Sequence, residues 1–103
     1  MGFLRRRRQK PGTLRQAESA DVRYLQEWIA SRTGIEGFIE PRTAVTDVTM
    51  LLVAVTGEWT RRRVPSAEWA HEFCNRNEIP SYDAAVVGVP DRMREWNRTH
   101  KRS

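Results

Sequence analysis

The sequence predicts an α+β protein, a single domain with the element order α-β-β-β-α-β-α. In this fold a small mixed sheet with a central hairpin carries its helices mainly on one face. Three observations predict the class. Apolar residues recur at helical spacing in two segments, a β-branched apolar run lies between turn residues, and a strand, a helix and a strand follow one another over residues 58–89. With 103 residues, of which 39% are hydrophobic, the chain has material for one modest core.

The two ends of the chain are expected to lie outside this domain. Residues 1–12 have no periodic apolar pattern and end in the breaker pair Pro11-Gly12, so they predict a flexible basic arm. The single domain is then expected over residues 13–99, and residues 100–103 are expected to form a basic C-terminal tail.

The first helix is predicted from its caps and its apolar spacing. Thr13 with Gln16 is a candidate capping box, Ser19 is a second candidate N-cap, and Gly34 is suited to end the helix after Thr33. The apolar stripe of this helix consists of Val22, Leu25, Trp28 and Ile29.

Three strands are predicted next. Residues 35–40 form a short strand, and residues 48–55 are apolar on both faces, which is typical of a central strand that is covered on both sides or paired on both edges. The Thr-Gly pair at residues 56–57 supplies a tight turn, so residues 58–64 are expected to return as the hairpin partner.

The second half of the domain is predicted to hold a helix, a fourth strand and a last helix. Ser66 is the expected N-cap of the second helix, which ends near Asn77. The apolar residues 84–89 predict a fourth strand, parallel to the third through a right-handed crossover. Pro90 suits the first turn of a last helix that carries Met93.

Charge is distributed unevenly along the chain. The formal net charge of +5 lies in the first ten residues, whereas residues 11–90 carry −3 and residues 91–103 carry +3. A charge block of this kind is typical of a tail that binds a polyanion. We call the residues of this block the N-terminal basic block: Arg5, Arg6, Arg7, Arg8 and Lys10.

The hairpin strand predicts a second contact with nucleic acid. The period-two alternation of a strand places one aromatic ring and two guanidinium groups on the same face, and such a face can stack a base and bind its phosphates. The alternative is a solvated face, on which the ring packs at the edge of the core and the guanidinium groups extend over it. The residues concerned are Trp59, Arg61 and Arg63.

The last helix carries a third cationic element. Arg94, Arg98 and Lys101 recur at i, i+4 and i+7, on the side opposite Met93 and Trp96. This stripe is suited to a phosphate backbone, and the alternative is the solvated face of a docking helix. If all three basic elements contacted one nucleic acid, its affinity would fall by orders of magnitude over a modest salt increase. That hypothesis requires the three elements to share one face.

The residue types that carry catalysis or bind metals are few. His71, His100 and Cys74 do not supply a cluster of three or four nitrogen or sulfur ligands at a recognised spacing. Cys74 lies one turn from His71 but beside Phe73 in an apolar stripe, which indicates a buried structural thiol. The sequence contains no Gly-rich nucleotide fingerprint. We therefore expect no catalytic, cofactor-binding or metal-binding residues.

Cysteine content and hydropathy predict the compartment. A single cysteine is typical of a reducing environment, so a cytoplasmic location is expected. No transmembrane segment is expected, because the apolar run at residues 48–55 is far shorter than the roughly 18–20 residues that span a bilayer. Phe3 and Leu4, next to the N-terminal basic block, leave weak attachment to an anionic membrane as an alternative.

Four segments carry a resemblance to a known family. They are residues 40–43, 45–49, 57–64 and 86–90, which read EPRT, VTDVT, GEWTRRRV and VVGVP. The chain is similar to a family of small basic uncharacterised proteins of high-GC Gram-positive bacteria, over about residues 14–99. Some members bear the label oxidoreductase, but the four segments contain no redox pair and no cofactor fingerprint.

These observations favour a non-enzymatic domain that binds a polyanion, above all RNA or a ribonucleoprotein surface. The double-stranded RNA-binding domain shares the order α-β-β-β-α, although the second helix of this chain lacks the Lys cluster of that domain. The alternative is a protein–protein interaction module that docks its partner through Trp59 and a sheet edge. An enzyme of oxidoreductase type is the third hypothesis.

Overall fold

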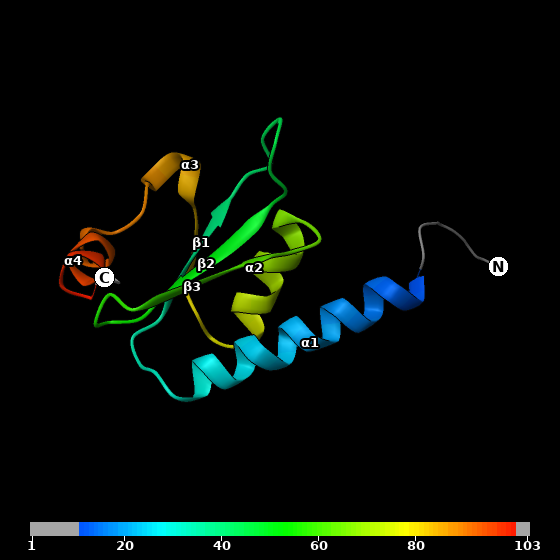
Figure 1. Ribbon diagram of the computed structural model, residues 1–103, viewed down its shortest axis with the longest axis horizontal. Coiled ribbons are helices and arrows are strands. Elements are labelled where there is room, and N and C mark those ends of the chain that lie inside the picture. Colours follow the sequence, from blue (N-terminus) through cyan, green and yellow to red (C-terminus); the bar gives the residue numbers. More distant parts are fainter. Residues whose placement is uncertain (1–10, 101–103) are drawn as a thin grey trace. The chain divides into compact units, whose positions relative to one another are not determined.

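The structure is a computed structural model that describes the backbone of residues 11–100 and the side chains of residues 21–100 (Figure 1). The chain divides into two compact units, Met1–Ser31 and Arg32–Ser103. The predicted α+β class is confirmed, and a small mixed sheet forms the centre of the second unit.

The first unit is described through helix α1 (Pro11–Ala30). This helix includes the Pro-Gly pair that the sequence assigns to the arm, because proline is tolerated in the first helical turn, where its missing N–H has no intrahelical partner. At its other end the Ser31 hydroxyl donates to two carbonyl oxygens of the last turn, each at 3.2 Å. Helix α1 therefore begins before both candidate N-caps and ends earlier than predicted. Leu25 and Trp28 of its predicted stripe are buried.

Four strands form one mixed sheet in the order β3-β2-β1-β4 (Figure 1). Strand β1 (Glu36–Glu40) pairs antiparallel with β2 (Thr49–Val53), β2 pairs antiparallel with β3 (Trp59–Arg63), and β4 (Ser81–Asp83) pairs parallel with β1. The central hairpin is thus confirmed, and β2 is paired on both edges. Strands β3 and β4 run in the same direction, but β2 and β1 lie between them.

One face of the sheet packs against helix α4 (Asp91–Thr99), and we call it the α4 face. The ring of Tyr82 packs against the ring of Phe38 there, with 5.4 Å between centroids. Burial of these apolar side chains supplies the main stabilisation on this side of the sheet. The buried cluster consists of Phe38, Leu51, Val53 and Met93.

The register of the hairpin determines which residues of β3 share the α4 face. Val53 lies opposite Trp59, and Leu51 lies opposite Arg61. Directly opposed residues of an antiparallel pair point to the same side of the sheet. Trp59 and Arg61 therefore share the α4 face with this apolar cluster, and so does Arg63, two residues further along.

The opposite face packs against helix α2 (Ala67–Arg76). The predicted cap is present, because the Ser66 hydroxyl accepts a hydrogen bond from the Trp69 N–H at 3.0 Å. Cys74 is fully buried, with its sulfur 3.9 Å from the sulfur of Met50. Within residues 32–100, then, the helices lie on both faces, α2 on one and α4 on the other. The prediction of helices mainly on one face does not describe this unit.

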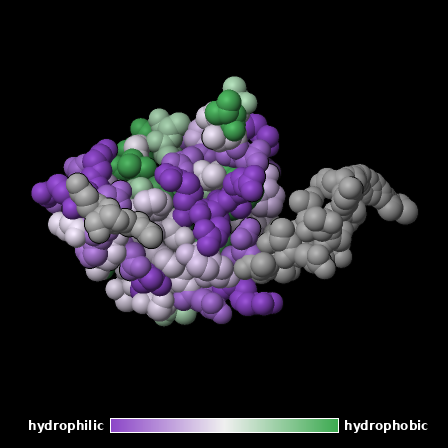
Figure 2. Space-filling model, in the orientation of Figure 1, coloured by the Kyte–Doolittle hydropathy of each residue, from purple (hydrophilic) through white to green (hydrophobic). Residues whose placement is uncertain are grey.

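The predicted fourth strand at residues 84–89 is wrong. The strand is β4, and residues 84–87 form the short helix α3 (Ala84–Val87), because the Asp83 carboxylate accepts the Ala85 N–H at 2.9 Å and caps a helical turn. Val86 and Val87 are 78% and 56% exposed, so this apolar run is not a core strand. Figure 2 shows hydrophobic surface over α3 and at the tip of the loop between β1 and β2.

Candidate functional site

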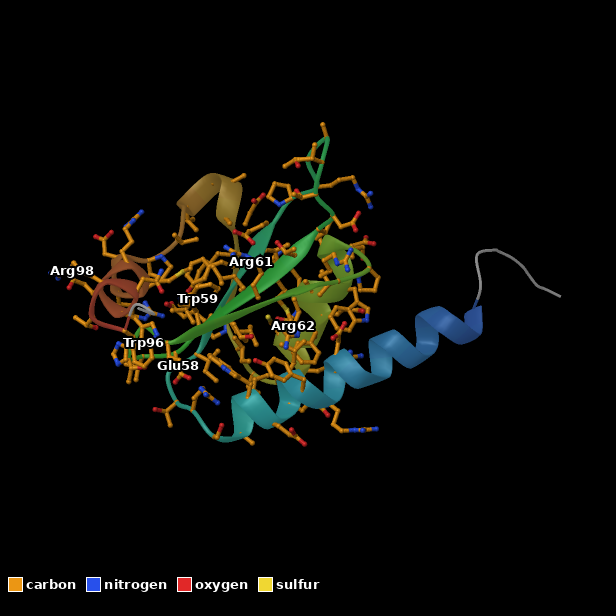
Figure 3. The ribbon with its side chains drawn as sticks, viewed as in Figure 1. Glu58, Trp59, Arg61, Arg62, Trp96 and Arg98 are labelled. Carbon is orange, nitrogen blue, oxygen red and sulfur yellow. The ribbon has the colours of Figure 1, made fainter. Side chains whose placement is uncertain are left out.

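The predicted nucleic-acid residues of the hairpin meet helix α4 at Trp59. The indole N–H of Trp59 donates to the Asn97 carboxamide oxygen at 2.7 Å, and the partly buried ring packs against the apolar cluster of the α4 face. Figure 3 shows Trp59 on the same side of β3 as Arg61, next to α4, whereas Arg62 leaves the strand on the other side. The ring thus packs at the edge of the core, as the alternative interpretation of this face predicts.

Arg61 is held in a fixed orientation by two partners. Its guanidinium carbon lies 5.3 Å from the centroid of the Trp59 ring. Its Nε and Nη2 donate to the two oxygens of Glu40 at 2.8 and 3.0 Å, a bidentate pair. Thr49 also donates to Glu40, at 2.6 Å. The fork of Arg61 is therefore oriented by side chains from three strands.

The environment of Glu40 lowers its pKa. Burial alone would raise this pKa, but hydrogen bonds from Arg61 and Thr49 and the charge of Arg61 outweigh burial and hold it below the usual value of 4.5. A carboxyl group with a lower pKa in the folded chain than in the unfolded chain stabilises the fold above its unfolded pKa. This stabilisation is lost as the pH falls through the folded pKa.

We expect the free energy of unfolding of Arg61→Gln to fall less steeply than that of the unsubstituted chain as the pH is lowered into the acid range. The reason is that Glu40 loses the partner that lowers its pKa. The measurement is the free energy of urea unfolding at several values between about pH 6 and pH 3. Arg76→Gln is the matched control, since Arg76 is exposed on α2. An equally steep fall in Arg61→Gln would contradict this account of Glu40.

Arg63 is the most exposed guanidinium of the predicted hairpin face. Its side chain is 77% exposed and lies 3.6 Å from Asp47, a carboxylate that also pairs with Arg42 at 3.5 Å. Exposed ion pairs of this kind contribute between about 0 and 1 kcal/mol. A stronger anion can therefore replace Asp47 as the partner of Arg63 at little cost.

The cationic stripe of α4 is also paired with acids. Arg94 pairs with Asp91 and Arg98 with Glu95, each one turn away along the helix. Figure 3 shows Arg98 on the outer side of α4, away from Arg61. The structure thus brings α4 to the same face as the hairpin, while Arg98 points away from that face. The third residue of the stripe, Lys101, and the whole N-terminal basic block lie outside the described residues.

Arg92 is a structural residue that the sequence pattern did not single out. Its Nε donates to the Ala54 carbonyl oxygen at 2.9 Å, and its Nη2 donates to Glu36 at 2.8 Å and to the Val53 carbonyl oxygen at 3.4 Å. These bonds attach the first turn of α4 to β1 and to the end of β2. In the sequence, only its position next to the apolar Met93 could have indicated a structural role for Arg92.

Cys74 and His71 do not form the pair of nucleophile and general base that their spacing in the sequence suggests. Burial raises the pKa of the Cys74 thiol to about 11, so the thiolate is not populated at neutral pH. His71 instead pairs with Ser81, with 2.7 Å between Nδ1 and Oγ. Ser81 therefore orients the imidazole ring, and within residues 21–100 no group of three metal-ligating side chains occurs.

The described residues define the class of protein as α+β with a four-stranded mixed sheet, whose predicted binding face carries an ordered tryptophan–arginine pair beside an exposed arginine. No protein-family model, curated protein or solved structure matches the chain. The resemblance to a family of high-GC Gram-positive bacteria therefore stays a prediction. Within the described part of the chain, no helix has the length and apolar character needed to cross a membrane.

Proposed function

We propose that this chain is a non-enzymatic domain that binds a polyanion, with RNA or a ribonucleoprotein surface as its target. The observation that carries the proposal is the packing of the Arg61 guanidinium over the Trp59 ring, 5.3 Å from its centroid, beside the exposed Arg63. A ring and a guanidinium group held together offer a stacking surface and a phosphate ligand at one place.

The hydrogen bonds of Arg61 leave it able to take a phosphate. Its Nε and Nη2 are bound to Glu40, and among the described side chains Nη1 has no partner. A phosphate oxygen can therefore accept from Nη1 without displacing Glu40. Since the fork is already oriented, little conformational entropy is lost on binding.

The net charge of the described part of the chain indicates that the termini contribute much of the affinity for a polyanion. Residues 11–100 hold eleven arginines and thirteen carboxylates, so this part of the chain repels a polyanion at long range. The positive net charge lies in the N-terminal basic block and in residues 101–103. We infer that the termini supply most of the affinity, and that the Arg61 guanidinium, held over the Trp59 ring, supplies orientation and a plane on which a base can stack.

The test is fluorescence anisotropy of labelled RNA and DNA oligomers with the full chain, over a range of salt concentrations. Replacing the five residues of the N-terminal basic block by Gln should lower the affinity at low salt by about a hundredfold or more. The slope of log affinity against log salt should also become shallower, by about 0.7 for each phosphate that the variant no longer neutralises. No binding by the unsubstituted chain at low salt would overturn the proposal.

Two single variants separate the folded face from general electrostatics. Arg63→Gln removes an exposed guanidinium from the α4 face, whereas Arg76→Gln removes the same charge from α2. We expect Arg63→Gln to weaken binding several-fold more than Arg76→Gln, because only Arg63 lies on the α4 face. Equal effects would leave the termini as the sole contact surface.

The two other hypotheses from the sequence are supported unequally. β3 is the last strand of the sheet, and no described strand pairs with its outer side, which favours the protein–protein interaction alternative. No observation on residues 21–100 favours the oxidoreductase alternative. Weak attachment to an anionic membrane depends on residues that lie outside the described part of the chain.

A further inference from the structure

Strand β3 has a free backbone edge, which we call the outer edge of β3. β3 is the last strand in the sheet order, and no described strand pairs with its outer side. At the two ends of the β2–β3 ladder the Ala54 N–H donates to the Glu58 carbonyl oxygen at 2.8 Å, and the Val64 N–H donates to the Val48 carbonyl oxygen at 3.0 Å. Because hydrogen-bonded pairs alternate along an antiparallel ladder, the residues whose backbone groups face outward are Trp59, Arg61 and Arg63.

These outward groups form a regular template for another strand. All three residues present an N–H group, and Trp59 and Arg63 present carbonyl oxygens, whereas the Arg61 carbonyl accepts from Arg62 Nη1 at 3.0 Å. An exposed edge of this kind pairs readily with an extended chain. Figure 2 views the molecule from the side on which β3 lies in front, and the surface there is hydrophilic. The side chains on this side are therefore compatible with a polar partner.

We propose that an extended acidic segment of a partner protein binds the outer edge of β3 by strand addition. In this mode backbone hydrogen bonds supply affinity and alternate side chains supply specificity. Arg61 and Arg63 lie on the same face next to the edge, with 41% and 77% of their side chains exposed. Carboxylates at alternate positions of the added strand would lie about 5 Å from them, as directly opposed side chains do.

Charge selects this occupant over the chain's own ends and over a second copy. Residues 1–10 and 101–103 are basic, so either end would place like charges beside Arg61 and Arg63. Two β3 strands paired antiparallel about Arg61 would set the two copies of Arg61 directly opposite each other. An acidic segment meets opposite charge at both positions, which makes it the favoured occupant.

This inference is independent of the proposed polyanion binding. RNA has no regular ladder of N–H and C=O groups, so it can use the side chains of this face but not the backbone of the outer edge. Strand addition needs the backbone. An experiment that reads the backbone amides therefore distinguishes the two.

The test is amide hydrogen exchange of the full chain by NMR, with a peptide of alternating Glu and Val and, as a control, a peptide of alternating Lys and Val. The Glu peptide should slow exchange about tenfold or more at the outward amides of Trp59, Arg61 and Arg63. The amides of Thr60 and Arg62 already face β2 and should change little. Protection that does not alternate, or equal protection by the Lys peptide, would overturn the proposal.

A pair of substitutions at one position gives a second readout. Arg63→Ala removes the charge, and Arg63→Pro removes both the charge and the outward N–H, while it leaves every bond to β2 intact. The Glu peptide should bind Arg63→Pro at least about fivefold more weakly than Arg63→Ala. RNA should bind both variants equally. If circular dichroism shows that Arg63→Pro is unfolded, the hydrogen-exchange experiment alone decides. In that experiment, RNA added instead of the peptide should not protect alternate amides of β3, and such protection by RNA would refute strand addition.

Discussion

Gly57→Ala is expected to destabilise the protein by about 3 kcal/mol or more, a large part of the stability of a small domain. Gly57 lies in the hairpin turn with a φ of 97°, a conformation that costs a side chain about 1–2 kcal/mol. A Cβ atom there would also clash with the Arg92 carbonyl oxygen and would lie 3.1 Å from the Trp96 Cβ. The substitution would therefore force α4 away from the hairpin turn.

The chain offers a matched control at Gly88. This glycine also has a positive φ, 75°, but a Cβ atom there would meet no other atom within 4 Å. Gly88→Ala should therefore show the conformational cost alone. The measurement is urea unfolding followed by tryptophan fluorescence, because Trp59 and Trp96 report on the attachment of α4. Equal losses of stability in the two variants would show that the hairpin turn does not pack closely against α4.

Gly37→Ala is expected to destabilise the fold by about 2 kcal/mol, through overpacking between β1 and α2. A Cβ atom at this position would lie 2.7 Å from the sulfur of Cys74, which is fully buried and has no space into which to move. The next nearest atoms, in the side chains of Leu52 and Ser81, would lie at ordinary contact distances of 3.5 and 3.7 Å, so the clash depends on the sulfur atom. The second variant for the test is therefore Cys74→Ala.

A double-mutant cycle checks this explanation. Cys74→Ala leaves a small cavity and should cost about 1 kcal/mol by itself. In the double variant the new methyl group at position 37 fills that cavity, so the two losses should not add, and the coupling energy should reach about 2 kcal/mol. The measurement is the free energy of urea unfolding of the four proteins. Additive losses would show that Gly37 is required for another reason.

Arginine serves two purposes in this molecule, and the sequence did not separate them. Arg92 binds two backbone carbonyls and Glu36, and Arg32 donates to Glu58 at 2.6 Å, which lowers the pKa of that carboxyl group. These two residues hold loops and strand ends together. Arg63, by contrast, projects 77% of its side chain into solvent. An exposed arginine of this second kind is suited to an anionic partner.

Part of the candidate site was predictable from the sequence, and part depended on the sheet order. Strand periodicity alone places Trp59, Arg61 and Arg63 on one face, because alternation is a property of any extended strand. Glu40 is 21 residues away from Arg61 along the chain, and nothing in the sequence pairs them. Their contact depends on β1 and β3 both lying beside β2, which is a matter of sheet order. The outer edge of β3 depends on sheet order in the same way.

By itself the sequence determined those features that rest on local interactions and on composition. The apolar run of β2, the tight turn before β3, the Ser66 cap of α2 and the concentration of charge in the first ten residues are all set by neighbours within a few positions. Only the tertiary structure decided that β4 pairs with β1, that residues 84–87 form a helix, and that Arg61 binds Glu40. The physical reason is that strand pairing, the exposure of an apolar run and the partner of a charge are determined by groups distant in the chain, which folding brings together.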